Sequence, residues 1–323
     1  MYKYILVGDL HSKPSNVEET KRIFAFLNEL CKENNIKYVF ILGDLFDTHG
    51  IIHLSVVYCY YDLFLKYSDL KFYCLTGNHD YEVHGNVSKN ALLSFKFLPN
   101  VKVVDDFYTF LLDENLFDFI PHCSNENFYK FNFEKKSNIV LCHHTFKGAQ
   151  YENGFFAPDG IEMDNVNYSL IISGHIHKIQ RMNKVFYIGS PRWLKESDSN
   201  EDRGVWLWDG ENDFLFKSTE PVCRKIIKLR LDKENFKEFD FDLKNKYILE
   251  VTGDNQFVEF LSNKFSGKAE IRHIFNQVSN IKVKESDGIF ASLEKFIKKS
   301  YCPMNNISND LLWKEIQERL SCE

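Results

Sequence analysis

The sequence predicts an α/β fold in which two mixed sheets pack face to face between outer helices, an αββα sandwich, followed by a small C-terminal α+β capping domain and terminal helices. Two observations predict it. Over residues 4–75 short apolar runs alternate with stretches of helical periodicity, which is typical of a layered α/β domain. After about residue 100 the pattern changes to consecutive strands, which would form a second sheet packed on the first.

The first half begins with an apolar strand at residues 4–7 that ends at Gly8. A capping-box pattern, Ser15-Asn16-Val17-Glu18, predicts that a helix follows, with its apolar face at residues 23–31. A strand, a helix and a strand then follow at residues 38–42, 54–66 and 72–75. Ligands bind at the carboxyl ends of the strands in such sheets, so polar residues that follow each strand are candidate site residues.

The second half is predicted to consist of short strands and turns. These strands are expected at residues 101–104, 107–112, 118–121, 138–141, 169–172, 185–188, 205–208 and 214–217. We place the first domain at residues 1–225 and the α+β domain at 226–285, with a strand at 247–251, a helix at 256–265 and a strand at 269–275. Two helices, at 288–299 and 310–320, would form a third segment over 286–323.

Composition bounds the class of protein. No apolar run approaches the roughly 20 residues that span a bilayer, and the start of the chain lacks the pattern of a signal peptide. Eight scattered cysteines without a C-x-x-C pair indicate a reducing compartment, so we expect a cytoplasmic protein, in the host cytoplasm if a phage encodes it. The net charge of −6 argues mildly against a nucleic-acid binder.

Five short blocks carry most of the chemistry. They are Gly8-Asp9-Leu10-His11, Gly43-Asp44-Leu45-Phe46-Asp47, Gly77-Asn78-His79-Asp80, Cys142-His143-His144 and Gly174-His175-Ile176-His177. Six of the 11 histidines fall inside them. Oxygen ligands and imidazoles supplied from separate loops are what a dinuclear Mn, Zn or Fe site needs. A single Gly-Asp at a strand end usually only caps a helix, but all five blocks in order predict a two-metal phosphoesterase centre.

The spacing within the blocks suits two ions. In Asp9-x-His11 and His175-x-His177, side chains two residues apart can converge on the metals from an extended backbone. The two oxygens of Asp44 can bridge cations roughly 3.5–4 Å apart. Asn78 can offer a carbonyl oxygen while the next residue, His79, points toward substrate. Either His143 or His144 completes the set.

The blocks and their order resemble those of the calcineurin-like metallophosphoesterases over residues 1–220. The resemblance implies one metal held by Asp9, His11, Asp44 and His177, and a second held by Asp44, Asn78, His143 and His175. His143 is preferred to His144 on the family pattern. The family resemblance also implies that His79 contacts the scissile phosphate and protonates the leaving oxygen. Asp47 and Asp80 would orient their neighbours. A hydroxide that bridges the two ions would attack phosphorus in line.

Further segments resemble one branch, the SbcD-type DNA nucleases, in a compact phage-type form. They are Gly43-Asp44-Leu45-Phe46-Asp47-Thr48, Gly77-Asn78-His79-Asp80, Tyr187-Ile188-Gly189-Ser190-Pro191 and Asp202-Arg203-Gly204. This resemblance implies an exo- or endonuclease that works with manganese, with Mg²⁺, Zn²⁺ or Fe as alternatives. It also implies an SbcC-type coiled-coil ATPase partner in DNA recombination and repair, and a homodimer. The apolar face of the last helix, at 312–320, could dock on that partner or pack on its own domain.

A basic window at residues 174–195 would face DNA. It holds five basic and no acidic residues and interleaves Phe186, Tyr187 and Trp193, although an ordinary hairpin with buried aromatics would read the same way. The candidate substrate contacts are Lys178, Arg181, Arg192 and His144. Two other functions stay open: a phosphodiesterase or phosphatase acting on a small molecule, and a non-catalytic scaffold subunit.

Overall fold

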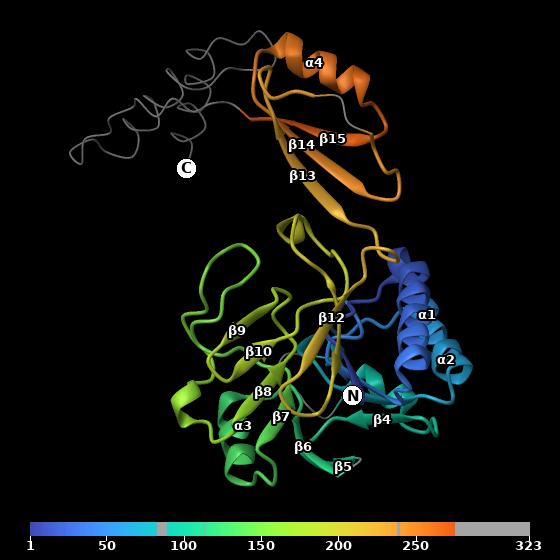
Figure 1. Ribbon diagram of the computed structural model, residues 1–323, viewed down its shortest axis with the longest axis vertical. Coiled ribbons are helices and arrows are strands. Elements are labelled where there is room, and N and C mark those ends of the chain that lie inside the picture. The colour runs from blue at the N-terminus through green and yellow to red at the C-terminus, as the bar shows by residue number, and fades with distance from the viewer. Residues whose placement is uncertain (83–88, 113, 238–239, 275–323) are drawn as a thin grey trace, which may run out of the picture. The chain divides into compact units, whose positions relative to one another are not determined.

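The computed structural model describes residues 1–82, 89–112, 114–237 and 240–274. It confirms the predicted αββα sandwich, with two six-stranded mixed sheets stacked between helices (Figure 1). The chain divides into two compact units, residues 1–228 with 240–248 and residues 229–239 with 249–323. The sandwich lies in the first unit.

The first sheet has the order β12-β11-β1-β2-β3-β4. β1, β2, β3 and β4 run parallel, whereas β11 is antiparallel to β1 and to β12. These strands span Tyr4–Val7, Tyr38–Leu42, Lys71–Leu75, Val101–Val104, Gly204–Trp208 and Phe214–Ser218 in chain order.

The second sheet has the order β5-β6-β7-β8-β10-β9. β6, β7, β8 and β10 are parallel, while β5 and β9 pair antiparallel at the two edges. These strands span Tyr108–Leu112, Asn115–Ile120, Ile139–Cys142, Leu170–Ser173, Gln180–Met182 and Val185–Tyr187 in the order β5 to β10.

Strand alternation separates the layers. Tyr4 and Leu6 pack between the two sheets, whereas Ile5 and Val7 face the helices α1 (Val17–Asn34) and α2 (Leu54–Lys66). Both faces of the first sheet are therefore buried, which explains why its strands read as continuous apolar runs. A third core lies on the outer face of the second sheet, where Phe128 of α3 (Asn125–Phe133) packs.

The structure differs from the sequence expectations at two helices. The predicted capping box is wrong: α1 begins at Val17 after a 3₁₀ turn, Pro14–Asn16, and no side chain caps it. The Asn16 amide instead accepts the N–H of Lys13 and donates to the carbonyl of His11. The prediction of consecutive strands also missed α3, which connects the parallel strands β6 and β7. Its sequence signal was Ser124, whose hydroxyl accepts the N–H of Asn127.

Within the described residues, a three-stranded sheet, β13-β14-β15, and one helix follow the sandwich in the chain. Their bounds are Ile226–Leu231, Lys246–Val251 and Ala269–His273 for the strands and Asn255–Lys264 for α4. The strand β13 was not predicted. The domain limits proposed at residues 225 and 285 stay predictions, and both predicted terminal helices lie outside the described residues.

Candidate metal centre

The five polar blocks meet at one edge of the sandwich, because each follows the carboxyl end of a parallel strand. Asp9 and His11 follow β1, Asp44 and Asp47 follow β2, Asn78 to Asp80 follow β3, His143 and His144 follow β7, and His175 and His177 follow β8. The blocks that follow three strands of the first sheet and two strands of the second sheet thus lie together. The predicted position of the site at the strand ends agrees with the structure.

Within this edge, three overlapping groups of side chains have their ligand atoms within 4.8 Å of one another. The groups are Asp9 with His11 and His177, His11 with Asp44 and His79, and Asp44 with His143 and His175. The six side chains that the sequence analysis proposed as carboxylate or imidazole ligands all belong to these groups. His79 joins them as well.

Asp44 lies between the two proposed ligand sets. Its Oδ2 is 3.5 Å from Nε2 of His11 and 3.4 Å from Nε2 of His143. Its Oδ1 accepts the backbone N–H of His79 at 2.8 Å. One carboxylate therefore faces both sets of imidazoles, which is the arrangement that a bridging ligand requires.

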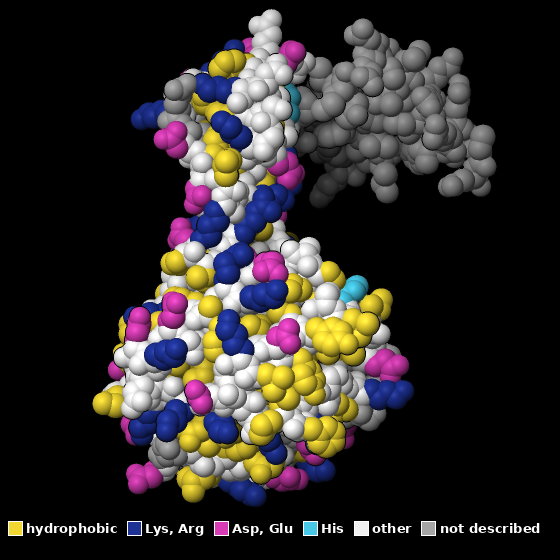
Figure 2. Space-filling view, turned by 90° about the vertical axis from the view of Figure 1, so that its right-hand side faces the viewer, with side chains coloured by type: hydrophobic (Ala, Val, Ile, Leu, Met, Phe, Trp, Pro, Cys, Tyr) yellow, Lys and Arg dark blue, Asp and Glu magenta, His cyan; other side chains and the backbone are white. Residues whose placement is uncertain are grey.

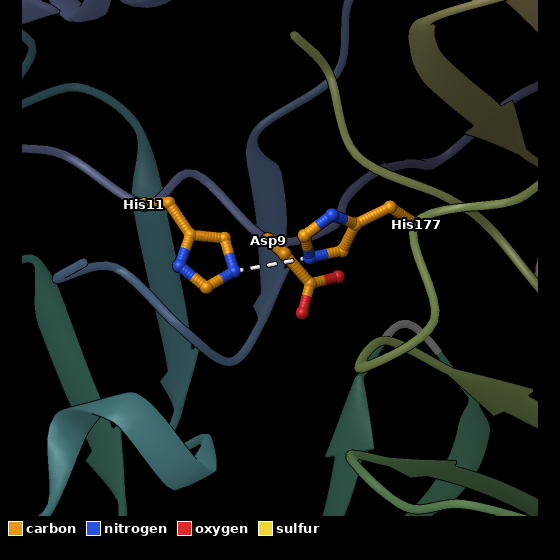
Figure 3. Close-up of side chains that lie close together, drawn as sticks. All are labelled: Asp9, His11 and His177. Atoms are coloured by element: carbon orange, nitrogen blue, oxygen red, sulfur yellow. Dashed lines mark hydrogen bonds between the residues drawn. The ribbon is translucent and has the colours of Figure 1, made fainter. Parts of the chain in front are cut away.

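The first proposed ligand set, Asp9, His11, Asp44 and His177, brings the loop after β1 against the loop after β8 (Figure 3). The Nε2 atoms of His11 and His177 point toward one another and lie 3.0 Å apart. The carboxylate of Asp9 lies beside them and accepts the N–H of His175 at 2.9 Å. The Nδ1 atom of His177 is buried and has no hydrogen-bond partner among the described residues.

The second set converges on the amide oxygen of Asn78. This atom lies 3.0 Å from Nε2 of His143 and 2.8 Å from Nδ1 of His175. His143 donates Nδ1–H to the carbonyl of Leu42 at 2.7 Å, which turns its Nε2 into the cluster. Burial opposes the charged ring, but the carboxylates of Asp44 and Asp9 outweigh burial and raise the pKa of His143 to about 9, so a metal ion would displace a proton from Nε2. The neighbouring His144 is buried elsewhere, with Nε2 at 2.9 Å from the carbonyl of Pro121. The geometry thus favours His143 over His144 as the ligand.

Several site residues adopt unusual backbone conformations. His11, Asp44 and His175 have positive φ values of 42°, 50° and 78°. L-residues rarely adopt this region, and such strain clusters at functional sites. Gly43, at φ 98°, leaves room for the imidazole of His143: a Cβ there would lie 2.1 Å from its Nδ1. The loops are packed against one another without space for a side chain at this glycine.

The electrostatics of the buried cluster suit cations. Burial lowers the pKa of His11 to about 4 and that of His175 to about 3, so both rings are neutral at pH 7 and present lone pairs. Burial raises the pKa of Asp9 to about 7. Burial alone would also raise the pKa of Asp44, but His143 and other nearby imidazoles outweigh it and hold that pKa well below its usual range. Neutral nitrogen donors, carboxylate oxygens and the unpartnered Nδ1 of His177 fit divalent ions.

His79 lies at the mouth of the cluster. It donates Nδ1–H to the carbonyl of Asp47 at 2.7 Å, which leaves Nε2 as the other ring atom, and its ring stacks on His49 with 4.4 Å between centroids. Asp80 connects two site loops, because its carboxylate accepts the N–H of Gly77 at 2.9 Å and that of Phe46 at 3.1 Å. Asp47 lies 3.1 Å from Nζ of Lys13.

A pocket of about 350 Å³ opens over the cluster, which we call the metal pocket. It is lined by His11, Lys13, Asp44, Asp47, Asn78, His79, Tyr151, Glu152, His175, His177, Leu194 and Lys195. Glu152 was not predicted from the sequence, and its Oε1 accepts the backbone N–H of His177 at 2.7 Å. No motif marks this residue; it reaches the site because residues 145–161 fold back over it.

The proposed substrate contacts do not line the metal pocket. Lys178 donates to Gln150 at 2.8 Å, and Arg181 is exposed, with its guanidinium 5.9 Å from the ring of Phe186. Arg192 is 1% exposed and donates to Thr20. His144 is also buried.

Phe186, Tyr187 and Trp193 are buried too, so the interpretation of this window as a surface of cations and aromatics is wrong for the aromatics. Phe186 and Tyr187 lie on β10 and Trp193 follows that strand, and all three contribute to the hydrophobic cores.

The segment Asp202-Arg203-Gly204 has a structural role beside the site. Arg203 is fully buried and donates to the main-chain oxygen of His177 and to Asp198, the latter at 2.8 Å. Asp198 in turn accepts the N–H groups of Leu194 and Lys195. The pair thus holds both the His177 loop and one wall of the metal pocket.

An αββα sandwich with this centre at its strand ends defines a metal-dependent phosphoesterase. Residues 2–179 match the calcineurin-like phosphoesterase family, and the chain belongs to that family. This confirms the resemblance drawn from the sequence. Members of the family use divalent metals to hydrolyse phosphoesters.

The chain is also similar to two curated relatives and to one solved structure. It is 31% identical over 195 residues to exonuclease subunit 1 of Enterobacteria phage T4, a match that covers 57% of this chain and 56% of the relative. It is 25% identical over 177 residues to the DNA double-strand break repair protein Mre11 of Nanoarchaeum equitans, covering 52% and 46%. The structure of an archaeal phosphodiesterase matches 67% of this chain and 98% of its own, at 11% identity and a TM-score of 0.35.

The chain thus spans about half the length of these two curated relatives. Among the described residues, none of the helices has both the length and the apolar character that crossing a bilayer requires.

Proposed function

We propose that this protein is the nuclease subunit of a DNA-processing complex, an exo- or endonuclease that hydrolyses DNA phosphodiesters. The observation that carries the proposal is the carboxylate of Asp44 between two sets of imidazoles below an open pocket. The names of the two relatives, an exonuclease subunit and a double-strand break repair protein, support DNA as the substrate.

The proposed roles are those that the family resemblance implies, and the geometry supports them. Asp9, His11, Asp44 and His177 would hold one divalent ion, and Asp44, Asn78, His143 and His175 the other. When bound, such ions lower the pKa of water and neutralise charge on the phosphate. Nε2 of His79 would donate a proton to the leaving oxygen, while its Nδ1–H bond to Asp47 orients the ring. Asp80 would hold the loops that carry Asp44 and Asn78 in place.

The proposed partners come from the resemblance to the SbcD-type nucleases. We propose an SbcC-type coiled-coil ATPase as the partner; the helices expected to bind it lie outside the described residues.

A homodimer is proposed as well. Figure 2 faces the side that carries α1 and α2 and shows hydrophobic side chains gathered there. Exposed apolar residues of this region are Ile51, Ile52, Leu54, Tyr58, Tyr61 and Leu65.

A cytoplasmic location is proposed from cysteine chemistry. Six cysteines in the described part of the chain are free and buried, and none of these forms a disulfide. Burial raises the pKa of the Cys31, Cys142 and Cys223 thiols to about 12, which keeps them protonated and unreactive. Such thiols fit a reducing compartment.

The test is metal-dependent cleavage of end-labelled duplex and single-stranded DNA beside a chromogenic phosphodiester. Mn²⁺, Mg²⁺, Zn²⁺ and Fe²⁺ are compared, and we expect Mn²⁺ to support the highest rate. Asp44→Ala removes the bridging carboxylate, and Asp62→Ala, at an exposed position on α2, is the matched control. We expect Asp44→Ala to abolish DNA cleavage and Asp62→Ala to retain it.

Two outcomes would contradict the proposal. Hydrolysis of the chromogenic ester with DNA untouched, even with a candidate ATPase added, would place the protein among small-molecule phosphodiesterases or phosphatases. Equal DNA cleavage by Asp44→Ala and the wild type would show that the activity does not arise at this centre.

A further inference from the structure

A second cavity adjoins the metal pocket. It has a volume of about 360 Å³ and shares three wall residues, Lys13, Leu194 and Lys195, with the metal pocket. The two cavities therefore adjoin at two segments of the chain, one with Lys13 and one with Leu194 and Lys195. We call the second cavity the basic pocket.

Positive charge predominates in the basic pocket. Its basic lining residues are Lys13, Arg22, Arg192, Lys195, Arg224 and Lys246, and its acidic ones are Glu18, Glu19 and Glu196. Each acid is already engaged. Glu18 lies 2.7 Å from Nζ of Lys21, Glu196 lies 3.0 Å from Nζ of Lys228, and Glu19 accepts the N–H of Arg224.

The guanidinium groups are less completely engaged than the acids. Arg224 is exposed, and its side chain makes no hydrogen bond or ion pair within the described part of the chain. Arg192 is 1% exposed, and its Nε and Nη1 atoms have no hydrogen-bond partner there. Its nearest acid, Glu19, lies 3.6 Å from Nη1. A buried guanidinium with unused donors is costly unless an anion is bound nearby.

The start of α1 also faces the cavity. The 3₁₀ turn Pro14–Asn16 leads into α1, and residues of its first turn line the cavity. The first N–H groups of a helix and its macrodipole favour an anion, above all a phosphate. The first-turn residues that line the cavity are Glu18 and Glu19, whose carboxylates offset part of this dipole, so the positive charge of the cavity comes from its basic side chains.

We propose that the basic pocket is a second phosphate site, which binds a backbone phosphate of the strand whose scissile phosphate lies in the metal pocket. The inference rests on the proposed nuclease function and adds a substrate requirement. A small diester fills the metal pocket alone, whereas a polynucleotide also reaches Arg224 and the start of α1. Strands with a further phosphate on one side of the scissile bond are therefore the preferred substrates.

Binding is measured first, in EDTA, so that the readout does not depend on catalysis. A fluorescein-labelled single-stranded oligonucleotide is titrated against the wild type, Arg224→Gln and Arg22→Gln/Arg224→Gln. The control is Lys96→Gln/Lys130→Gln, which removes two charges from exposed positions outside both pockets. We expect Kd to rise roughly fivefold per pocket substitution. The salt slope of log K should fall by about 0.7 for each lost phosphate contact.

A phosphate scan then locates the contact. A single uncharged methylphosphonate link is moved along the oligonucleotide, and KM is measured with each. The wild type should lose affinity at one link beyond the scissile one. The Arg22→Gln/Arg224→Gln variant should lose this sensitivity, because the charge that read the phosphate is gone. The variant should also raise KM for the oligonucleotide more than KM for the chromogenic diester.

The outcomes separate the two proposals. DNA cleavage with pocket variants that bind like the lysine control, or with no sensitive link, would overturn the second phosphate site alone. Equal competition by a mononucleotide and by the oligonucleotide at this pocket would also overturn it, in favour of a free-nucleotide site. A wild type that hydrolyses the diester and neither binds nor cleaves DNA would contradict the nuclease function itself.

Discussion

The Nε2 atoms of His11 and His177 lie 3.0 Å apart, although 166 residues separate them in the chain. Burial lowers the pKa of His11 to about 4 and holds that of His177 well below its usual value, so both rings are neutral at pH 7. The two neutral rings hydrogen-bond through these atoms beside the carboxylate of Asp9 (Figure 3). The contact closes the site between the first strand of the chain and the loop after β8.

Metal affinity should rise with pH. Burial raises the pKa of Asp9 to about 7 in the metal-free protein, so much of this carboxyl is protonated at pH 6. A cation binds only the deprotonated ligand, and the proton must leave first. Between pH 6 and pH 8 this one group should strengthen Mn²⁺ binding roughly tenfold.

Calorimetry in two buffers of different ionisation enthalpy measures both the affinity and the protons released. The raised pKa of His143, about 9 because Asp44 and Asp9 outweigh its burial, should add to the release. Equal affinities at pH 6 and pH 8 with no proton release would contradict the assignment of these ligands.

Glu152 should position His177 through its acceptor oxygen. Glu152→Gln keeps an oxygen for the 2.7 Å bond to the His177 N–H, whereas Glu152→Ala removes it. We expect kcat/KM for the chromogenic diester to fall roughly tenfold in the alanine variant and much less in the glutamine variant. Equal losses in both would assign the effect to the carboxylate charge, which also faces Lys195 at 3.8 Å.

Arg203 should be required for stability. Its removal leaves Asp198 as a buried charge without its cation, a change that typically costs about 3–5 kcal/mol. Urea denaturation of Arg203→Ala measures this loss. Arg181→Ala is the matched control, because Arg181 is exposed and should change stability by only about 0.5 kcal/mol. Similar midpoints for both variants would show that the buried pair contributes little.

Substituting two glycines with similar backbone conformations distinguishes the cost of backbone strain from the cost of a steric clash. Gly43 and Gly154 have φ values of 98° and 87°, but a Cβ at Gly154 meets nothing within 4 Å. Gly154→Ala should cost about 1 kcal/mol through its backbone alone. Gly43→Ala should cost more and weaken Mn²⁺ binding, because its Cβ must displace the imidazole of His143. Matching melting temperatures and metal affinities in the two variants would contradict this reading of Gly43.

The blocks at the strand ends could be predicted because each carries its own local signal. An apolar run followed by Gly-Asp or Gly-His marks the end of a parallel strand, and parallel strands share one carboxyl edge. This rule brought Asp9, Asp44 and His175 to one edge from the sequence alone, whereas His143, which follows Cys142, was chosen from the family resemblance. The substrate contacts had no such rule. Lys178 and Arg192 were chosen by charge and proximity in the chain, and neither lines the metal pocket.

The sequence by itself determined the αββα sandwich, the family and the edge where the candidate ligands gather, because apolar periodicity and strand-end motifs are local properties. Only the tertiary structure decided which histidine of the His143–His144 pair faces the cluster, since that depends on the carbonyl of Leu42 in another sheet. It also decided the positions of Glu152 and Arg203 and the presence of the basic pocket. These depend on loops that meet across the sandwich, and no single stretch of sequence encodes such contacts.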